Sequence, residues 1–79
     1  METAYVLINC DLGTELPIIS SLKQMKSVKE IHGIFGAFDI ITKLENQDKD
    51  EIRKTVIEDI RKLEHVRSTL TLMGVKGQS

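Results

Sequence analysis

This sequence of 79 residues has little cysteine, proline or aromatic side chain. It contains one cysteine, one proline, one tyrosine, two phenylalanines and no tryptophan. The lone Cys10 cannot form a disulfide within the chain, and a small domain without disulfides needs a metal or a partner subunit for stability. The other soft metal ligands are His32 and His65, and their spacing matches no zinc motif. We therefore expect no metal or other cofactor, and we expect oligomerisation to supply the missing stability.

An excess of one charge and long hydrophobic runs are also absent. Eleven basic residues are balanced by twelve acidic ones, for a net charge of −1. This balance leaves no basic surface for nucleic acid or anionic lipid. The sequence has no apolar run of about 18 residues and no charged N-terminal region followed by an apolar one. We therefore expect a cytoplasmic protein that binds neither DNA nor a membrane directly.

The hydrophobic residues that are present divide a single domain, residues 1–79, into six elements. Runs of β-branched and aromatic residues predict strands, and apolar residues at every third or fourth position predict helices. Thr14 is expected to cap the first helix, and Asp48, three residues before Glu51, the second. The expected elements are strands at 4–10, 28–32, 38–45 and 66–75, and helices at 15–25 and 48–64.

This order, βαββαβ, is typical of the ferredoxin-like α+β fold. The two middle strands form a hairpin around the turn from Gly33 to Gly36. Right-handed crossovers then place both helices on one face of a four-stranded antiparallel sheet.

The strands are apolar on both faces, although the helices can cover only one. Side chains alternate between the two faces of a strand, so a monomer would leave an apolar sheet face in water. We expect two copies to pack sheet against sheet as a dimeric α/β sandwich. The side chains assigned to this interface are Tyr5, Leu7, Ile41, Met73 and Val75.

Asp39 is the side chain most suggestive of a ligand. An aspartate beside glycines at the start of a strand can pair with an ammonium group, and nearby backbone N–H groups can receive a carboxylate. Thr69 and Thr71 lie on one face of the last strand and offer hydroxyl groups. Together they would suit a free amino acid. The alternative is that Asp39 caps its own turn and that the threonines are ordinary strand residues.

The sequence contains no arrangement of residues that suggests catalysis. His32 and His65 are expected on an edge strand and at a helix end, with no nucleophile assigned beside either. A Ser–His–Asp set, a phosphate-binding loop and a spaced pair of carboxylates are all lacking. We therefore expect no catalytic residues and no enzyme activity.

Two motifs resemble the effector domain of the Lrp/AsnC regulators, also called the RAM domain. The first is VKEIHGIFGAFDII at residues 28–41, with glycine, a variable residue, an aromatic and aspartate at the start of the second strand. The second is VRSTLT at residues 66–71, a valine followed by a T-x-T strand. The resemblance extends over residues 3–75 and departs at His65, where the family often has glycine. The resemblance begins at the effector domain and is to the stand-alone RAM proteins, so we expect a protein without the family's N-terminal helix-turn-helix.

The resemblance implies a regulatory sensor and a location for its ligand. Family members form sheet-to-sheet dimers that assemble further, into rings such as octamers, and bind amino acids or related metabolites near the contacts between dimers. We assign the ligand's ammonium to Asp39 and its carboxylate to backbone N–H groups and hydroxyls. Full-length Lrp/AsnC regulators are a further partner. By position, the ligand-contacting residues are Gly36, Ala37, Phe38, Asp39, Thr69 and Thr71.

Two other functions share this topology. A small dimeric α/β-barrel enzyme, such as a cofactor-free monooxygenase, would usually be longer and carry His, Trp or Asn in a pocket between helices and sheet. The lack of tryptophan and the aromatic content of 4% disfavour it. An ACT-like allosteric module has a similar topology, but the T-x-T strand and the glycine-aromatic-aspartate turn favour the Lrp/AsnC effector domain. Topology alone does not choose among these functions.

Overall fold

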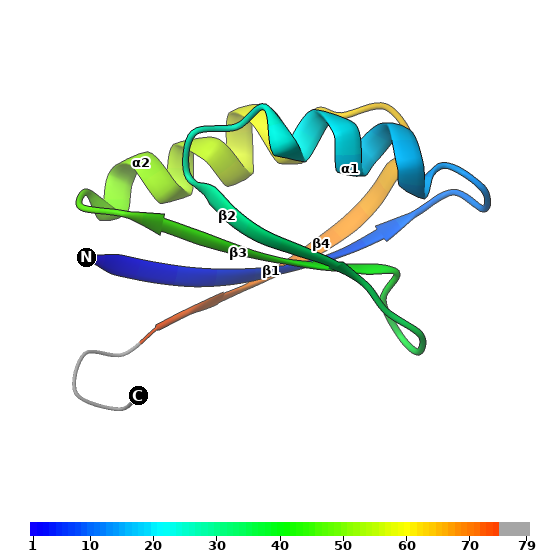
Figure 1. Cartoon of the computed structure of the whole chain (residues 1–79), viewed down its shortest axis with the longest axis horizontal. Coiled ribbons are helices and arrows are strands. Elements are labelled where there is room, and N and C mark those ends of the chain that lie inside the picture. The colour runs from blue at the N-terminus through cyan, green and yellow to red at the C-terminus, as the bar shows by residue number, and fades with distance from the viewer. Residues whose placement is uncertain (75–79) are drawn as a thin grey trace.

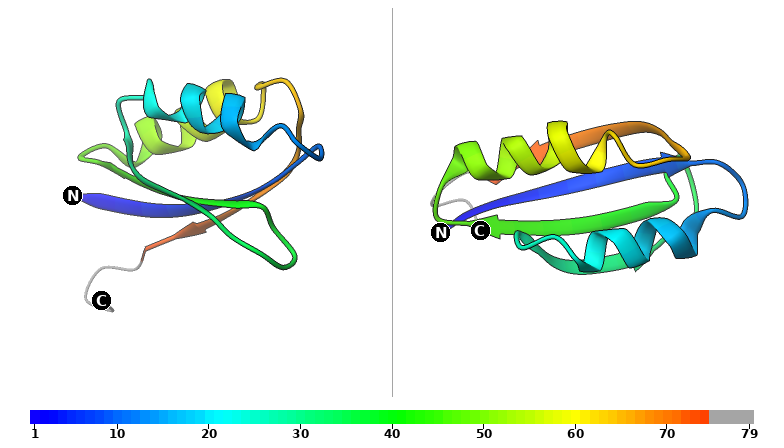
Figure 2. Two further views of the ribbon diagram at one scale, coloured as in Figure 1. Left: turned by 45° about the vertical axis from the view of Figure 1, so that its right-hand side comes forward. Right: turned by 90° about the horizontal axis from the view of Figure 1, so that it is seen from above.

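The computed structural model describes residues 1–74 as a single sheet covered by a layer of helices (Figure 1). The strands are all antiparallel and lie in the order β2-β3-β1-β4. Both helical segments lie on the same side of the sheet in Figure 1 and in the left view of Figure 2, and the right view of Figure 2 looks down on them from above. The predicted ferredoxin-like fold is confirmed. In chain order the elements are β1 (Glu2–Cys10), α1 (Glu15–Lys23), β2 (Val28–Gly33), β3 (Ile40–Asn46), α2 (Lys49–Lys54), η1 (Thr55–Ile60) and β4 (Val66–Met73).

The two helices begin where predicted, but only one is capped by its predicted side chain. The Asp48 carboxylate accepts a hydrogen bond from the backbone N–H of Asp50 at 2.9 Å. Thr14 makes no capping bond; its backbone is not extended, at φ −106° and ψ 10°, and its hydroxyl donates to the Asp11 carbonyl at 2.7 Å. An N-cap side chain reaches the helix from an extended backbone, which explains the difference.

The second helix changes its geometry halfway along. Its α-helical part, α2, continues into a π-helical segment, η1, in which the Arg61 N–H donates to the Val56 carbonyl five residues back at 3.0 Å. Helical structure ends at Ile60 rather than near residue 64. Despite the wider turn, Ile52, Val56 and Ile60 all remain directed into the core, each 4% exposed or less.

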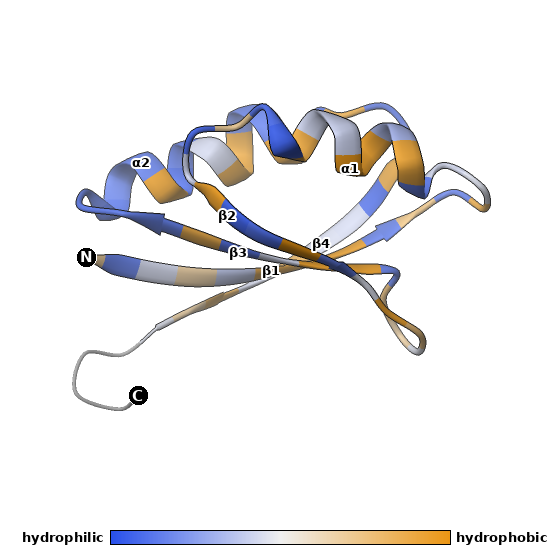
Figure 3. Ribbon diagram, viewed as in Figure 1, coloured by the Kyte–Doolittle hydropathy of each residue, from blue (hydrophilic) through white to orange (hydrophobic). Residues whose placement is uncertain are grey.

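The core lies between the helices and the sheet face they cover. Burial of each aliphatic side chain there contributes about 1.5–3 kcal/mol, and the apolar stripes of both helices face the sheet (Figure 3). Thr42 is also fully buried, and its hydroxyl donates to the Glu30 carbonyl of the neighbouring strand at 2.8 Å. The buried apolar side chains are Ala4, Val6, Ile8, Cys10, Ile18, Leu22, Ile40, Leu44, Ile52, Val56 and Ile60.

The opposite face of the sheet is not covered by any described segment and carries an apolar patch. Residues directly opposite each other on neighbouring strands point to the same face. Tyr5, Leu70 and Leu72 are between 40% and 51% exposed. The register pairs Tyr5 with Leu72, and Leu7 with both Leu70 and Ile41. We call these five side chains the open-face patch.

The prediction that Met73 belongs to this patch is wrong. Met73 lies opposite Ala4, which is fully buried beneath the helices, so Met73 points to the helix-covered side. Leu70 and Leu72 take the outward positions instead. Side chains alternate with a period of two, so a strand's register decides the face of every residue in it. Val75 lies outside the residues that the structure describes.

Candidate functional site

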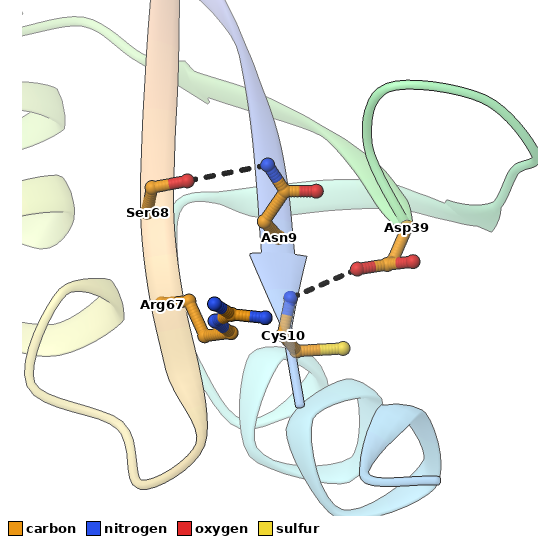
Figure 4. Close-up of a pocket in the computed structure, with 5 residues that line it drawn as sticks. All are labelled: Asn9, Cys10, Asp39, Arg67 and Ser68. Atoms are coloured by element: carbon orange, nitrogen blue, oxygen red, sulfur yellow. Dashed lines mark hydrogen bonds between the residues drawn. The ribbon is translucent and has the colours of Figure 1, made fainter. Parts of the chain in front are cut away.

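Asp39 lies just before β3, beside the end of β1 (Figure 4). Its backbone N–H donates to the Ile8 carbonyl at 2.9 Å, and its own carbonyl accepts from the Ile34 N–H at 2.9 Å. Its carboxylate oxygen Oδ2 accepts from the Cys10 N–H at 2.9 Å. The side chain therefore bonds to the neighbouring strand, β1, rather than capping its own turn. A carboxylate has about four lone-pair sites, so it retains acceptor capacity for a ligand.

A hollow of about 410 Å³ opens beside this carboxylate. It lies at the end of the sheet where β1 finishes and β3 and β4 begin. The Asn9 side-chain amide donates to the Ser68 hydroxyl at 3.2 Å and so links β1 to β4 across it. The wall therefore contains a carboxylate, a guanidinium, an amide and a hydroxyl (Figure 4). The lining residues are Asn9, Cys10, Asp39, Arg67 and Ser68.

Arg67 reaches this hollow because β4 is irregular at its start. Ser68 lies opposite Asn9, whereas Val66 lies opposite Cys10, so Arg67 is an extra residue on β4. An extra residue of this kind, a β-bulge, redirects the side chains of its strand. Figure 4 shows the Arg67 side chain directed from β4 toward Cys10.

The turn that precedes Arg67 is held to the end of β1 by Asp11. The Asp11 N–H donates to the His65 carbonyl at 2.9 Å, and its carboxylate lies 3.2 Å from His65 Nδ1 and 3.8 Å from Arg67 Nε. His65 adopts the left-handed conformation, with φ +74°. Glycine tolerates this conformation without steric cost, whereas a residue with a Cβ atom is strained in it.

The thiol of Cys10 is close to the hollow but is not activated. Its side chain is only 7% exposed. Burial raises the pKa of the Cys10 thiol above its ordinary value, and the nearby charges of Asp39 and Glu15 add to the rise, although a hydrogen bond with Thr14 opposes it. A protonated thiol is a poor nucleophile and a poor metal ligand. Within residues 1–74, no three His, Cys, Asp or Glu side chains gather where they could hold a metal ion.

The predicted ligand-contacting residues do not all meet at this hollow. Thr69 lines a neighbouring one, and its hydroxyl accepts from Arg61 Nε at 3.1 Å. Thr71 lies opposite Val6 on the helix-covered face, and its buried hydroxyl has no hydrogen-bond partner among the described residues. Their part in ligand binding, like that of the hairpin turn, stays a prediction. The turn residues that lie outside the lining of the 410 Å³ hollow are Gly36, Ala37 and Phe38.

Sequence analysis missed four of the five lining residues. The ends of β1 and β4 are adjacent in a ferredoxin-like sheet, so the strand order could have indicated Asn9 and Ser68. The bulge that turns Arg67 inward has no signal in the sequence, because it depends on how two strands 59 residues apart align.

No helix among residues 1–74 is long and apolar enough to cross a membrane.

Comparison with known proteins identifies relatives of two kinds. An uncharacterised HTH-type transcriptional regulator of Pyrococcus furiosus is 31% identical over 75 residues, which are 91% of this chain and 50% of that protein. A homocitrate synthase of Saccharolobus islandicus is 34% identical over 74 residues, which are 92% of this chain and 16% of the enzyme. The chain thus spans about half of the regulator and a smaller part of the enzyme.

Solved structures with the same fold match nearly the full length of the chain. The protein FFRP-DM1 has a TM-score of 0.90 and 29% identity, covering 95% of this chain and 100% of its own. The TTHA0845 protein of Thermus thermophilus has a TM-score of 0.92 and 25% identity, covering 100% and 99%. The family model of the Lrp/AsnC ligand binding domain matches residues 3–76. The match favours this family over an ACT-like module or an α/β-barrel enzyme, and the chain therefore belongs to the Lrp/AsnC ligand-binding domain family.

Proposed function

We propose that this protein is an amino-acid-sensing domain, and that its ligand binds in the 410 Å³ hollow beside Asp39. The observation that carries the proposal is the presence of the Asp39 carboxylate and the Arg67 guanidinium in one wall. A free amino acid carries the complementary ammonium and carboxylate groups, and both would form charge-assisted hydrogen bonds. The volume is within the range of about 300–1,000 Å³ that is usual for small-molecule sites.

The proposal changes one part of the assignment made from the sequence. Asp39 still receives the ammonium, but Arg67, together with the Ser68 hydroxyl, receives the carboxylate in place of backbone N–H groups. The exposed turn at Gly36 and Ala37 lies outside the lining, so it would contact the ligand from a neighbouring dimer. The hollow is partly open to solvent, and a second dimer would close it.

The relatives support a sensing role over a catalytic one. The same domain forms part of an HTH-type regulator and part of a homocitrate synthase, so what they share is neither DNA binding nor one catalytic reaction. A Neisseria meningitidis transcriptional regulator that was solved with L-Met has the same fold, at 11% identity and a TM-score of 0.86. We propose that this chain is a regulatory domain without enzyme activity of its own.

Regulation would act through assembly. We propose a homodimer in which two open-face patches, Tyr5, Leu7, Ile41, Leu70 and Leu72, cover each other, and which assembles further or combines with full-length Lrp/AsnC regulators. At about 25 cal/mol per Å² of apolar surface, burial of these side chains would contribute several kcal/mol. The proposal includes a single domain and the cytoplasmic location expected from the sequence.

Isothermal titration of the protein with each of the twenty amino acids tests the site. We expect at least one amino acid to bind. We expect Asp39→Asn to lower the affinity for this amino acid about tenfold or more, because the variant loses the charge that pairs with the ammonium. Asparagine can still accept the Cys10 N–H bond, so the sheet end stays intact. Asp59→Asn, an exposed aspartate on η1, is the matched control and should bind as the wild type does. Absence of binding by all twenty, or unchanged affinity in Asp39→Asn, would contradict the proposal.

A further inference from the structure

A second hollow, of about 280 Å³, adjoins the first at the start of β4. Its lining residues are Arg61, Val66, Arg67, Ser68 and Thr69. Arg67 and Ser68 line both hollows, so the two meet at these residues. A ligand held between Asp39 and Arg67 would have to extend its side chain past these two shared residues to reach the second hollow.

The second hollow contains cationic and hydroxyl groups but no carboxylate. Arg61 Nε donates to the Thr69 hydroxyl at 3.1 Å, which ties the guanidinium to β4. A guanidinium has five N–H donors, so the two terminal nitrogens remain to bind a carboxylate in the bidentate manner that arginine favours. Within the described part of the chain, residues 1–74, Arg61 forms no ion pair with a carboxylate.

Helix geometry and strand geometry together place the two arginines there. Arg61 directly follows η1, where the bond from its N–H to the Val56 carbonyl closes the wide turn. The chain then turns at once, because the Leu63 N–H donates to the Ile60 carbonyl at 3.2 Å. Arg67 enters from the other side, through the bulge in β4.

The charged side chains that line the two hollows are one carboxylate, Asp39, and two guanidinium groups, Arg61 and Arg67. These three side chains leave one positive charge in excess, although the Asp11 carboxylate, which lies outside both linings, is 3.8 Å from Arg67 Nε. A zwitterionic neutral amino acid would pair with Asp39 and Arg67 and leave Arg61 without a counter-charge. An amino acid with a second carboxylate would neutralise all three.

We propose, resting on the proposed amino-acid site, that the ligand is an acidic amino acid of the glutamate or aspartate type. Asp39 holds its ammonium, Arg67 its α-carboxylate, and Arg61 with Thr69 its side-chain carboxylate in the second hollow. Arg61 is thus the residue that determines specificity. The amides glutamine and asparagine match these ligands in size and lack only the side-chain charge, so they isolate this interaction.

Titration calorimetry with glutamate, glutamine, aspartate and asparagine tests the inference. We expect one of the two acids to bind about tenfold or more tightly than its own amide. In Arg61→Gln we expect this preference to fall to about twofold or less, because the affinity for the acid falls more than the affinity for the amide. Arg53→Gln, an exposed arginine of α2 that lines neither hollow, should keep the full preference.

The outcomes separate this inference from the proposed function. Equal binding of each acid and its amide, or a preference retained in Arg61→Gln, would overturn the acidic specificity alone. If a neutral amino acid bound most tightly and its binding depended on Asp39, the acidic specificity would be overturned and the proposed sensing site would be retained. Absence of binding by every amino acid would overturn both. Should Arg61→Gln lose its fold by circular dichroism, Arg61→Lys provides the second variant, in which the preference should be reduced but present, because lysine keeps the charge and loses the bidentate geometry.

Discussion

Three residues lie together at the end of β1 and have different roles: Asp39, Arg67 and Cys10. The Asp39 carboxylate bonds the Cys10 N–H and faces the hollow. Arg67 is brought into the same wall by the bulge in β4. The Cys10 side chain points away from solvent and contributes to the core. Asp39 and Arg67 therefore supply the charged groups of the hollow, and the Cys10 thiol packs in the core.

The raised pKa of the Cys10 thiol predicts how stability depends on alkaline pH. Because the unfolded thiol ionises at a lower pH than the folded one, its contribution to stability is complete below the unfolded pKa and is lost as the pH rises through the folded pKa. We expect the free energy of unfolding to fall more between pH 8 and pH 10 in the wild type than in Cys10→Ala. Urea unfolding at a series of pH values measures this. All other titratable groups are present in both proteins, so their effects cancel in the comparison. Equal losses in the two proteins would show that burial does not perturb this thiol.

At the scale of elements, the joint between the second helix and β4 is where the chain departs from regular geometry. A π-helical turn, a left-handed residue and a β-bulge follow one another between Val56 and Arg67. Irregularities of the helix and strand ladders are frequent at functional sites. Here they place Arg61 and Arg67 on the two adjoining hollows.

The left-handed conformation of His65 predicts an inverted preference between glycine and alanine. At an ordinary position alanine is the more stabilising of the two by about 0.5–1 kcal/mol. At φ +74° a Cβ atom is strained by about 1–2 kcal/mol, so we expect His65→Gly to exceed His65→Ala in stability by about 1 kcal/mol. Both variants lose the contact of the imidazole with Asp11 equally, and the comparison therefore isolates the backbone. Chemical denaturation measures the free energy of unfolding of the two variants. A more stable alanine variant would mean that the turn adopts another conformation.

At the scale of the whole molecule, the uncovered sheet face is divided into two halves. The half over β1 and β4 carries most of the open-face patch, and Ile41 extends it onto β3. The half over β2 and β3 is charged, with Lys43 Nζ 3.6 Å from carboxylate oxygens of both Glu30 and Glu45. Two copies that overlap through the apolar half would bury the patch and leave the ion pairs at the rim, where they remain solvated.

The homodimer predicts a defined response to one charge placed in the patch. Leu72, opposite Tyr5 and 51% exposed, is replaced by lysine, which would bury an unpaired ammonium in the interface. We expect light scattering after size-exclusion chromatography to shift from a multiple of 8.9 kDa to the 8.9 kDa monomer. Ile57→Lys, on η1 in the helical layer and 47% exposed, changes the same kind of side chain and should keep the dimer. A wild-type monomer, or a Leu72→Lys dimer, would contradict the proposed interface.

Hydrophobic periodicity by itself determined the kind and order of the elements. Alternation with a period of two and repetition every three or four residues are local properties, so they are readable along the chain without knowledge of its neighbours. The motif at residues 28–41 placed Asp39 at the start of the third strand, and the spacing of three residues from Asp48 to Glu51 placed Asp48 at the start of α2.

Tertiary structure alone decided the faces of β4 and the composition of the hollow. Whether Met73 or Leu72 points outward depends on the register of β4 against β1, and the position of Arg67 depends on the one-residue bulge in that register. The structure also decided that the second helix widens before Arg61. These features arise from the alignment of segments distant in sequence, where a shift of one residue reverses a side chain's direction, and no local pattern specifies such an alignment.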